Sequence, residues 1–448
     1  MSWQEVIEVK GGEPVTVTAR RAAQGMVQAW LPVENLAWVR AWGWDGGELD
    51  SLMTWVMLAT ERDMDAAHAR IGNMRTNINM YTMDRSGNIG YVHAGRYPQR
   101  AAGHDPRLPA PGKGDYDWHS LRPYSDNPTV RNPAQGYIAN WNNRPRADWI
   151  STDLWTYTWG RADRARILFD ALEARRGGTV ADIDGVNREI SFADVNAPFL
   201  LPYLFDAWQG AELDGEPGDA LALLREWDGN WVVNGEGDYG PANALMEAWL
   251  RLLLKAVIED DVGPEMFHLY AATNYPSGPL GPSIPNPPGV KVLLRNLDSL
   301  AAGREPDHDF FNGVDAAEVL REGFAAAVAE LAASQGADPA AWHISAHPMQ
   351  WKPYNFRGVP QASESLVHEL PGYLHRGSEN NLFVATGQGI VARDVVPPGQ
   401  SGFVGPGGAS AHLADQMGLY ADFEYKDVPF TLEQVKRISV SERTLMIR

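Results

Sequence analysis

Two pairs of short segments near the start of the chain alternate apolar and polar residues, which is typical of β-strands. Val6–Val9 and Val15–Thr18 flank a Gly-Gly turn, and Ile78–Met83 and Ile89–Ala94 flank the turn Asp84–Asn88. A period of two places alternate side chains on opposite faces of a strand, and turn residues between two such runs predict a hairpin. We therefore expect two β-hairpins in this part of the chain.

Other segments carry different local patterns. Residues 63–74 predict a short helix between the two hairpins, and Gly136–Trp141 predicts a further strand. Amphipathic patterns with the 3.6-residue period of a helix then cover 163–176, 241–259 and 315–333. Strand-like runs return at Leu382–Ala385 and Gly389–Ala392.

This order of strands, helices and again strands predicts an α+β fold with a mainly helical insertion. We expect three regions: a β-rich part over residues 1–162, a mainly helical part over 163–337, and a part of strands and loops over 338–448.

Composition and charge exclude several classes of function. The 448 residues are 44% hydrophobic, so a packed core is expected, while 38 Lys and Arg against 57 Asp and Glu give a formal charge of −19. Such a surface repels phosphate backbones and anionic lipid, so we expect neither nucleic acid nor a membrane as a partner. The absence of cysteine excludes disulfides, zinc–thiolate sites and thiol nucleophiles. The N-terminal residues do not read as a signal peptide.

Common catalytic and binding motifs are not matched. Gly408–His412 lacks the second glycine of a hydrolase nucleophile elbow, and Gly405–Ser410 lacks the third glycine of a dinucleotide-binding loop. His343 and His347 have the spacing of two zinc ligands on one helix face, but the general-base glutamate is missing and Pro348 follows directly. Generic motifs therefore leave the active site unassigned.

Seven longer segments carry a further signal: Gly87–His93, Gly103–Pro109, Gly136–Asn143, Trp159–Arg164, Gly358–Ala362, Arg376–Asn380 and Pro398–Phe403. In their order and at similar spacings, they resemble the nucleophile-bearing large chain of the penicillin acylases. These enzymes belong to the N-terminal nucleophile hydrolases. The resemblance implies the αββα four-layer sandwich of that superfamily, here incomplete.

The resemblance also implies the chemistry. A linear amide in an N-acyl compound, such as a β-lactam antibiotic or an N-acyl homoserine lactone, would be hydrolysed by a serine whose own α-amine acts as the base. That amine becomes free through autocatalytic cleavage of a precursor, and its ordinary pKa near ~8 suits it to accept the hydroxyl proton. No cofactor is implied for catalysis, and relatives are mostly periplasmic or secreted.

Two catalytic residues are carried over from the resemblance. Asn142 matches the side-chain donor of the oxyanion hole, and Arg164 matches the arginine beside the nucleophile's α-amine. An amide donor suits this role because it is uncharged and does not titrate. The alternative is that Asn140, Asn142 and Asn143 only cap and turn the end of a strand, and that Arg164 is an ordinary helix-surface arginine.

The resemblance further implies an acyl pocket and a calcium site. Trp55 and Ile78 match walls of the pocket, with Trp155 and Tyr157 as weaker candidates. Asp153 matches a carboxylate ligand of a structural calcium ion. Pro106 matches a backbone carbonyl ligand, but two oxygens are too few for a cation that takes six or more.

One departure from the family pattern affects the expected activity. Met1 stands just before the hairpin that follows about a hundred residues of the family's large chain, so the nucleophilic serine, that N-terminal segment and the companion small chain have no counterpart here. We expect the chain to be inactive alone. Ser2 as a nucleophile is a weaker hypothesis, because it falls at the start of an outer hairpin. The alternative function is a non-catalytic protein that binds acyl ligands or partners.

Overall fold

The computed structural model describes most of the chain, and it divides into two compact units. The described residues are 1–106, 108–149, 164–210, 215–271, 288–346, 349–351, 368–370, 376–377, 379–397, 399 and 415–444. The first unit comprises Met1–Ile138 and Arg144–Thr156, and the second comprises Ala139–Asn143 and Tyr157–Arg448. Mixed helix and sheet in both units agree with the predicted α+β class.

The strands of the first unit form three small antiparallel sheets. β1 pairs with β2, β3 pairs with β4 around a bulge, and β5 pairs with β6, which also pairs with β7. Both predicted hairpins are confirmed, and β5 and β6 have the predicted bounds. The elements are β1 Ser2–Ile7, β2 Val15–Arg20, β3 Met26–Leu31, β4 Leu36–Arg40, β5 Ile78–Met83, β6 Ile89–Ala94 and β7 Thr129–Arg131, with a short 3-10 turn at Tyr124–Asp126.

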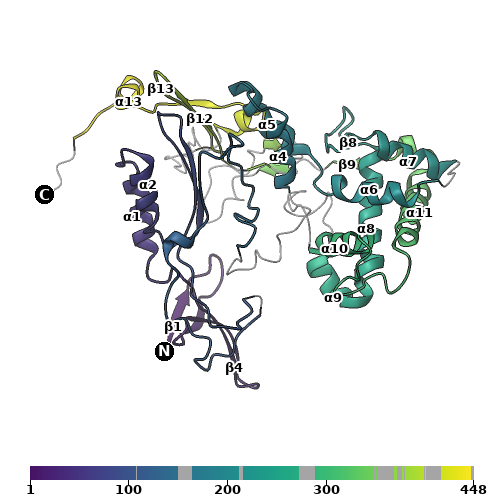
Figure 1. The fold of residues 1–448 in the computed structure, drawn as a ribbon, viewed down its shortest axis with the longest axis horizontal. Coiled ribbons are helices and arrows are strands. Elements are labelled where there is room, and N and C mark those ends of the chain that lie inside the picture. Colours follow the sequence, from purple (N-terminus) through teal and green to yellow (C-terminus); the bar gives the residue numbers. More distant parts are fainter. Residues whose placement is uncertain are drawn as a thin grey trace. The chain divides into compact units, whose positions relative to one another are not determined.

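Two helices lie beside the strand pair β5–β6 (Figure 1). They are α1, Glu48–Leu58, and α2, Met64–Ile71, whose N-cap Asp63 accepts a hydrogen bond from the backbone N–H of Ala66 at 2.8 Å. α2 confirms the helix predicted over 63–74, whereas the patterns along the chain did not predict α1. A small core cluster, to which Leu58 of α1 also packs, joins these helices to the strands; its buried members are Ile71, Met74, Val92 and Ala94.

α1 packs with its polar side inward. Ser51 and Thr54 are its buried residues. Its apolar side chains remain largely accessible: Leu49 is 68% exposed, Leu52 58%, Met53 49%, Trp55 49%, Val56 59% and Met57 38%. A helix of a globular protein normally buries its apolar stripe, so α1 presents an unusually apolar surface.

The second unit contains a large helical part with a single hydrophobic core. α8 lies at its centre and packs most extensively against α11. Trp249 and Leu253 of α8 are fully buried, and Leu253 lies against Gly323 of α11. The elements are α6 Ala197–Ala207, α7 Glu216–Glu226, β8 Asp238–Tyr239, α8 Pro241–Val262, α9 Pro264–Met266, the π-helical turn Phe267–Ala271, α10 Pro288–Ala301, α11 Ala316–Gln335, the 3-10 turn Pro339–Ala341 and β9 Ile344–Ser345.

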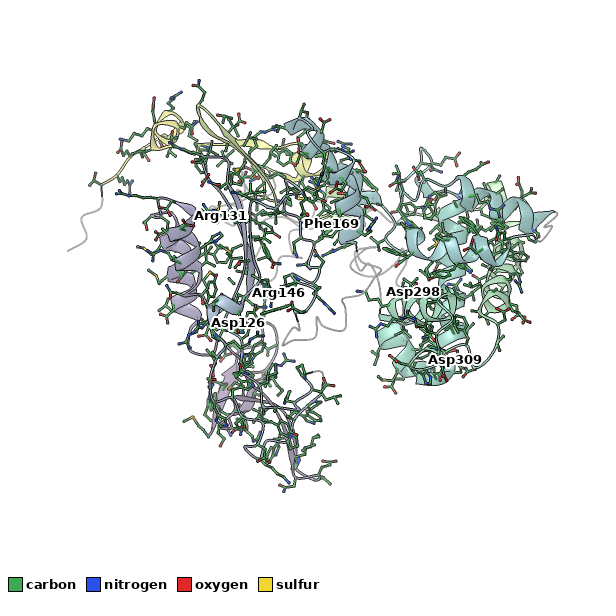
Figure 2. The ribbon with its side chains drawn as sticks, in the orientation of Figure 1. Asp126, Arg131, Arg146, Phe169, Asp298 and Asp309 are labelled. Carbon is green, nitrogen blue, oxygen red and sulfur yellow. The ribbon has the colours of Figure 1, made fainter. Side chains whose placement is uncertain are left out.

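Polar contacts support this helical core from its edges. The hydroxyl of Tyr203 on α6 donates a hydrogen bond to Asp298 of α10, and Asp309 accepts backbone N–H groups of Phe311 and Gly313 in the loop before α11 (Figure 2). Along the described residues, no helix combines the length and apolarity needed to cross a membrane.

The remaining described elements of the second unit are four helices and short antiparallel strands. α4 and α5 pack together, and β13 lies between β12 and β14. Arg188 of α5 donates to the carbonyl of Asp422, which ties α5 to the segment after α12. The elements are α4 Ala165–Glu173, α5 Val180–Phe192, β10 Met349–Trp351, β11 His368–Leu370, β12 Asn380–Thr386, β13 Gly389–Val395, α12 Met417–Ala421, β14 Lys426–Val428 and α13 Leu432–Ile438.

One local expectation is wrong. Gly136–Trp141 is not a strand but an irregular segment whose last residues form a turn, because asparagine side chains there compete for the backbone groups. His343 does not lie on a helix, since it directly precedes the short strand β9, and His347 lies outside the described residues. The helix-face geometry of a zinc pair is therefore absent at His343.

Candidate functional site

The predicted oxyanion donor lies in a compact turn built by its neighbours. Asn140 Oδ1 accepts the backbone N–H of Asn142 at 2.9 Å, and Asn143 Oδ1 accepts that of Trp141 at 2.8 Å. Asn140 Nδ2 also donates to the carbonyl of Asn143 at 3.2 Å. These crossed side-chain bonds hold Asn142 in the left-handed backbone region, with φ of 64°, which asparagine tolerates better than most residues.

Arg164 is brought into direct contact with this turn. It occupies the N-cap position of α4, and its Nη2 donates to Asn142 Oδ1 at 2.6 Å. Its guanidinium carbon lies 4.9 Å from the centre of the Trp141 ring, and its Nε donates to the Trp141 carbonyl at 3.4 Å. Two residues that are 22 positions apart in the sequence thus form one unit.

Hydrophobic packing anchors the pair. The partly buried ring of Trp141 packs against the core between α4 and α5, whose buried members are Ala171, Val186 and Ile190. Because Trp141 is adjacent to Asn142 and lies under the guanidinium, this packing restricts the side chains of Asn142 and Arg164. A preorganised donor is what stabilisation of developing negative charge requires.

The hydrogen bond to Arg164 defines the orientation of the Asn142 amide. Oδ1 faces the cation, so the Nδ2 hydrogens lie at the opposite end of the same planar group. A cation at the oxygen polarises the amide and makes its N–H bonds stronger donors. The arrangement can therefore donate a hydrogen bond to an oxyanion, although Asn140 and Asn143 do serve the turn, as the alternative interpretation has it.

The two described candidates for the acyl pocket lie in the first unit. Ile78 is the first residue of β5, pairs with Ala94 of β6, and packs against the small core cluster. Trp55 lies on α1, three residues before Leu58, and is 49% exposed. Ile78 thus has an ordinary core environment, whereas about half of the Trp55 side chain is accessible to a ligand or partner.

The other predicted positions are less informative. Trp155, Tyr157 and Asp153 lie outside the described residues, and Pro106 is partly buried in the loop after β6. In the part of the chain that the structure describes, no group of three or more His, Asp or Glu side chains could hold a metal ion. The described residues by themselves do not fit a calcium site, so calcium binding stays a prediction.

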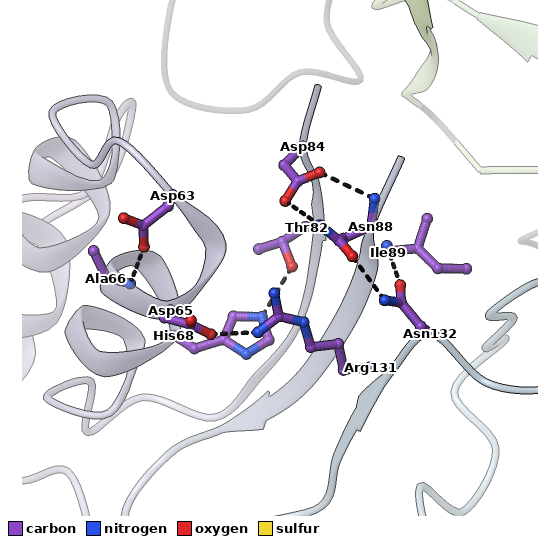
Figure 3. Close-up of polar contacts among 10 residues, drawn as sticks. All are labelled: Asp63, Asp65, Ala66, His68, Thr82, Asp84, Asn88, Ile89, Arg131 and Asn132. Atoms are coloured by element: carbon purple, nitrogen blue, oxygen red, sulfur yellow. Dashed lines mark hydrogen bonds and ion pairs between the residues drawn. The ribbon is translucent and has the colours of Figure 1, made fainter. Parts of the chain in front are cut away.

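A second polar cluster joins α2 to the β5–β6 hairpin (Figure 3). His68 Nε2 lies 2.9 Å from Thr82 Oγ1, and Arg131 forms an ion pair with Asp65. Burial is the larger cause and the positive charge of Arg131 the smaller cause of a lowered pKa of His68, while the negative charge of Asp65 raises that pKa. A neutral histidine bonded to a threonine is a structural tie, and the cluster contains no activated nucleophile.

Sequence reasoning missed one polar site altogether. A cleft of about 490 Å³ lies in the first unit between α1 and the segments after α2 and β6, and it contains Arg70, Arg75 and Arg96. These arginines are spread over 27 positions in the chain, and two of them follow the helix and the strand rather than lying within them. Only the tertiary structure brings them together.

Comparisons with known proteins agree with this fold. A family model described as penicillin amidase matches residues 1–437. Penicillin G acylase of Escherichia coli is 32% identical over 461 residues, which cover 100% of this chain and 54% of that protein. Acyl-homoserine lactone acylase QuiP of Pseudomonas syringae pv. tomato is 26% identical over 450 residues, which cover 94% and 49% of the respective chains.

A solved structure gives the same result. The thermostable penicillin G acylase from Alcaligenes faecalis matches with a TM-score of 0.91 and 33% identity, over 100% of this chain and 82% of that one. The match confirms the predicted fold class, α+β of the N-terminal nucleophile hydrolase type. The chain spans about half the length of the curated relatives it matches.

Proposed function

The chain belongs to the penicillin amidase family, and on this basis we propose that it serves in the hydrolysis of a linear amide in N-acyl compounds. The observation that carries the proposal is the contact between Arg164 and Asn142 at 2.6 Å. It joins a neutral donor and a cation, which are the two groups that the family resemblance predicts at these positions. Both act on charge that develops only as the amide carbonyl is attacked.

The proposed roles follow from the geometry of the pair. Asn142 Nδ2 donates to the oxygen of the tetrahedral intermediate, while Arg164 orients and polarises the amide through Oδ1. The positive charge of Arg164 would also lower the pKa of a nearby α-amine. A larger fraction of that amine would then be unprotonated near neutral pH and able to accept a proton. The nucleophile is the hydroxyl of an N-terminal serine, whose proton passes to its own α-amine.

We propose that the nucleophilic serine lies in the N-terminal segment of the family pattern, that this segment and the small chain complete the site, and that the 448 residues alone are inactive. The outward side of α1 supports an extensive partner surface, because Leu49, Leu52 and Val56 are each more than half exposed. Apolar surface of this extent on one helix is a feature of interfaces. Ser2 itself pairs with Arg20 in the exposed β1–β2 hairpin, where its backbone is part of a sheet.

The substrate class follows from the relatives. The named relatives are a penicillin G acylase and an acyl-homoserine lactone acylase, so the proposed substrates are N-acylated β-lactams and N-acyl homoserine lactones. The acyl pocket would include Trp55 and Ile78, with Trp155 and Tyr157. Periplasmic location, processing of a precursor and a structural calcium held partly by Asp153 and Pro106 are further proposals carried by the resemblance.

The alternative is a non-catalytic protein that keeps the acyl pocket and binds an acyl ligand or a partner. The exposed part of the Trp55 side chain is compatible with such binding. The two proposals differ in one measurable outcome, which is the release of a free amine.

The test compares amine release from phenylacetylated amides and N-acyl homoserine lactones by the 448 residues alone and by the same residues co-expressed with a serine-headed N-terminal segment and a small chain. We expect turnover in the complex only. In the complex, Asn142→Gly should lower kcat by about 100- to 1000-fold, since one oxyanion donor is lost. Glycine is chosen because it adopts the φ of 64° without strain.

Asn35→Gly is the matched control, because Asn35 is also a left-handed asparagine, with φ of 50°, but lies in the exposed β3–β4 turn. It should leave kcat within about twofold of the parent. Equal activity of the Asn142→Gly and parent complexes would refute the oxyanion role. A stable complex that binds phenylacetate without releasing amine would establish the non-catalytic alternative.

A further inference from the structure

The cleft beside α1 is a polar cavity that the proposed catalytic pair does not use. Its volume is about 490 Å³, and one wall is a stripe of α1 residues: Asp50, Met53, Thr54 and Met57. Residues four and seven apart lie on one side of a helix, so this stripe forms a continuous surface. The rest of the lining consists of Arg70, Gly72, Asn73, Arg75, Arg96 and Leu121.

The backbone on the arginine side is held rigidly. The buried Ser51 Oγ accepts the N–H groups of Arg75 at 3.0 Å and Thr76 at 3.2 Å, and donates to the Gly47 carbonyl at 2.9 Å. The N–H of Arg96 donates to the carbonyl of Arg75 at 3.2 Å. Two arginines from different segments are thereby fixed next to each other on one wall.

A glycine makes room for one of these side chains. A Cβ atom at Gly47 would lie 1.9 Å from Cδ of Arg75, so the aliphatic part of Arg75 lies directly over Gly47. Any side chain at position 47 would displace Arg75. The position of this guanidinium therefore depends on a residue that carries no charge itself.

The cleft has an excess of positive charge. Arg70 forms an ion pair with Glu61, but over the described residues neither Arg75 nor Arg96 forms one with a carboxylate. Asp50 is the one acidic residue among those that line the cleft. In a chain with a formal charge of −19, two adjacent arginines without carboxylate partners form a local site of opposite sign.

Three of the remaining lining residues are apolar and adaptable. Met53, Met57 and Leu121 contribute unbranched or flexible hydrophobic side chains, which fit irregular apolar ligands. A guanidinium binds a carboxylate through two parallel N–H···O bonds, so the cationic wall and the methionine wall fit the two ends of one amphipathic anion.

We propose that this cleft binds a small organic carboxylate, with the carboxylate on Arg75 and Arg96 and an apolar chain against Met53 and Met57. Only the source of the ligand rests on the proposed function, because hydrolysis of an N-acyl amide releases such an acid. The binding site itself is independent of turnover.

This site is distinct from the predicted acyl pocket at Trp55. Successive helix residues are separated by about 100°, so Trp55 lies on the far side of the buried Ser51 and Thr54 seam from Asp50, Met53 and Met57. A ligand in the cleft and one beside Trp55 therefore contact opposite sides of α1. A Trp55 variant therefore distinguishes ligand binding in the cleft from ligand binding in the predicted acyl pocket.

The test is calorimetric titration of the full chain with hexanoate and with hexanamide, which has the same chain length but no charge. We expect hexanoate to bind and hexanamide to bind at least tenfold more weakly. Arg75→Gln and Arg96→Gln should each weaken hexanoate binding by tenfold or more, and raised salt should weaken it further. Gly47→Ala, which keeps every charge but moves Arg75, should have a similar effect.

Arg85→Gln is the matched control, since Arg85 is an exposed arginine in the β5–β6 turn, and it should leave the affinity within about twofold. Trp55→Ala should also bind hexanoate as the parent does, with circular dichroism to confirm the fold of each variant. Equal binding of hexanamide, unchanged affinity in both Arg→Gln variants, or loss of binding in Trp55→Ala would each refute the proposal. None of these outcomes depends on amine release, so failure of the catalytic proposal is detected separately.

Discussion

The helical part of the second unit buries its apolar side chains, whereas helix α1 of the first unit leaves its apolar side chains largely exposed. α8 has twelve buried residues, of which eleven, including Trp249 and Leu253, belong to one large core. α1 buries Ser51 and Thr54 and leaves six large apolar side chains accessible. The helical part therefore has a hydrophobic core of its own. The apolar side chains of α1, in contrast, are accessible to a ligand or a partner.

Because of this difference, the apolar residues of the two regions contribute to different properties of the protein, folding stability in one and ligand or partner binding in the other. Apolar residues of the helical part contribute to the free energy of folding, at about 25 cal/mol for each Å² removed from water. Exposed residues of α1 contribute little to folding, but they are available for binding. The candidate binding features of the first unit are Trp55, which lies on α1, and the arginine cleft, which α1 partly lines.

The largest effect is expected from a cavity in the helical core. Leu253→Ala removes a fully buried side chain that contacts α11, and truncations of this kind cost about 2–5 kcal/mol. Leu52→Ala on α1 makes the same chemical change at a residue that is 58% exposed, and it should alter the free energy of unfolding by less than about 0.5 kcal/mol.

Urea unfolding of both leucine variants measures this contrast. A loss for Leu52→Ala that equals the loss for Leu253→Ala would contradict the comparison, because it would mean that α1 is buried in the free chain. Increased solubility of Leu52→Ala with unchanged stability would strengthen it, since an exposed interface residue promotes association.

A smaller effect is expected at Gly90 of β6, where the first unit does pack tightly. A Cβ atom there would lie 2.6 Å from Thr82 Oγ1 and 2.9 Å from both His68 Cε1 and Met64 Sδ. Gly90→Ala should therefore destabilise the first unit by about 1–3 kcal/mol. Gly87→Ala, in the same hairpin, is not an equivalent control because its φ is 83°; Gly185→Ala on α5 is better, since its Cβ meets no atom within 4 Å.

Elements whose own residues determine their conformation could be predicted from the sequence. The β5–β6 hairpin follows from strict alternation, and Asp84 stabilises its turn by accepting N–H groups of Ser86 and Asn88. α8 and α11 follow from their long amphipathic patterns. α1 could not be predicted as packed, because its apolar residues at 49, 52, 53 and 56 would place the buried side opposite to the one observed.

The prediction of the candidate site depended on a family resemblance and not on local sequence patterns. Asn142 and Arg164 were identified only through a family resemblance, since neither residue stands in a generic motif. The strand predicted over Gly136–Trp141 failed because Asn140 and Asn143 replace backbone partners with side-chain oxygens. The arginine cleft was missed because Arg75 and Arg96 meet only through a backbone bond between distant segments.

The smallest predicted effect is a pH dependence that belongs to the first unit alone. Because burial and Arg131 lower the pKa of His68, the folded state takes up a proton at lower pH than the unfolded state, whose ordinary pKa is near ~6.5. The unfolded state then binds more protons as pH falls below that value, so stability decreases toward acid and is fully present above it. His68→Gln keeps a side chain that can bond to Thr82 and removes the titration. The difference in unfolding free energy between parent and variant should change from pH 7.5 to 5 in urea titrations, while signals from the helical core should report no such difference. If the difference in unfolding free energy is the same at pH 7.5 and pH 5, the surroundings of His68 do not lower its pKa. The side chain of His68 would then be more exposed to water than its contact with Thr82 at 2.9 Å implies.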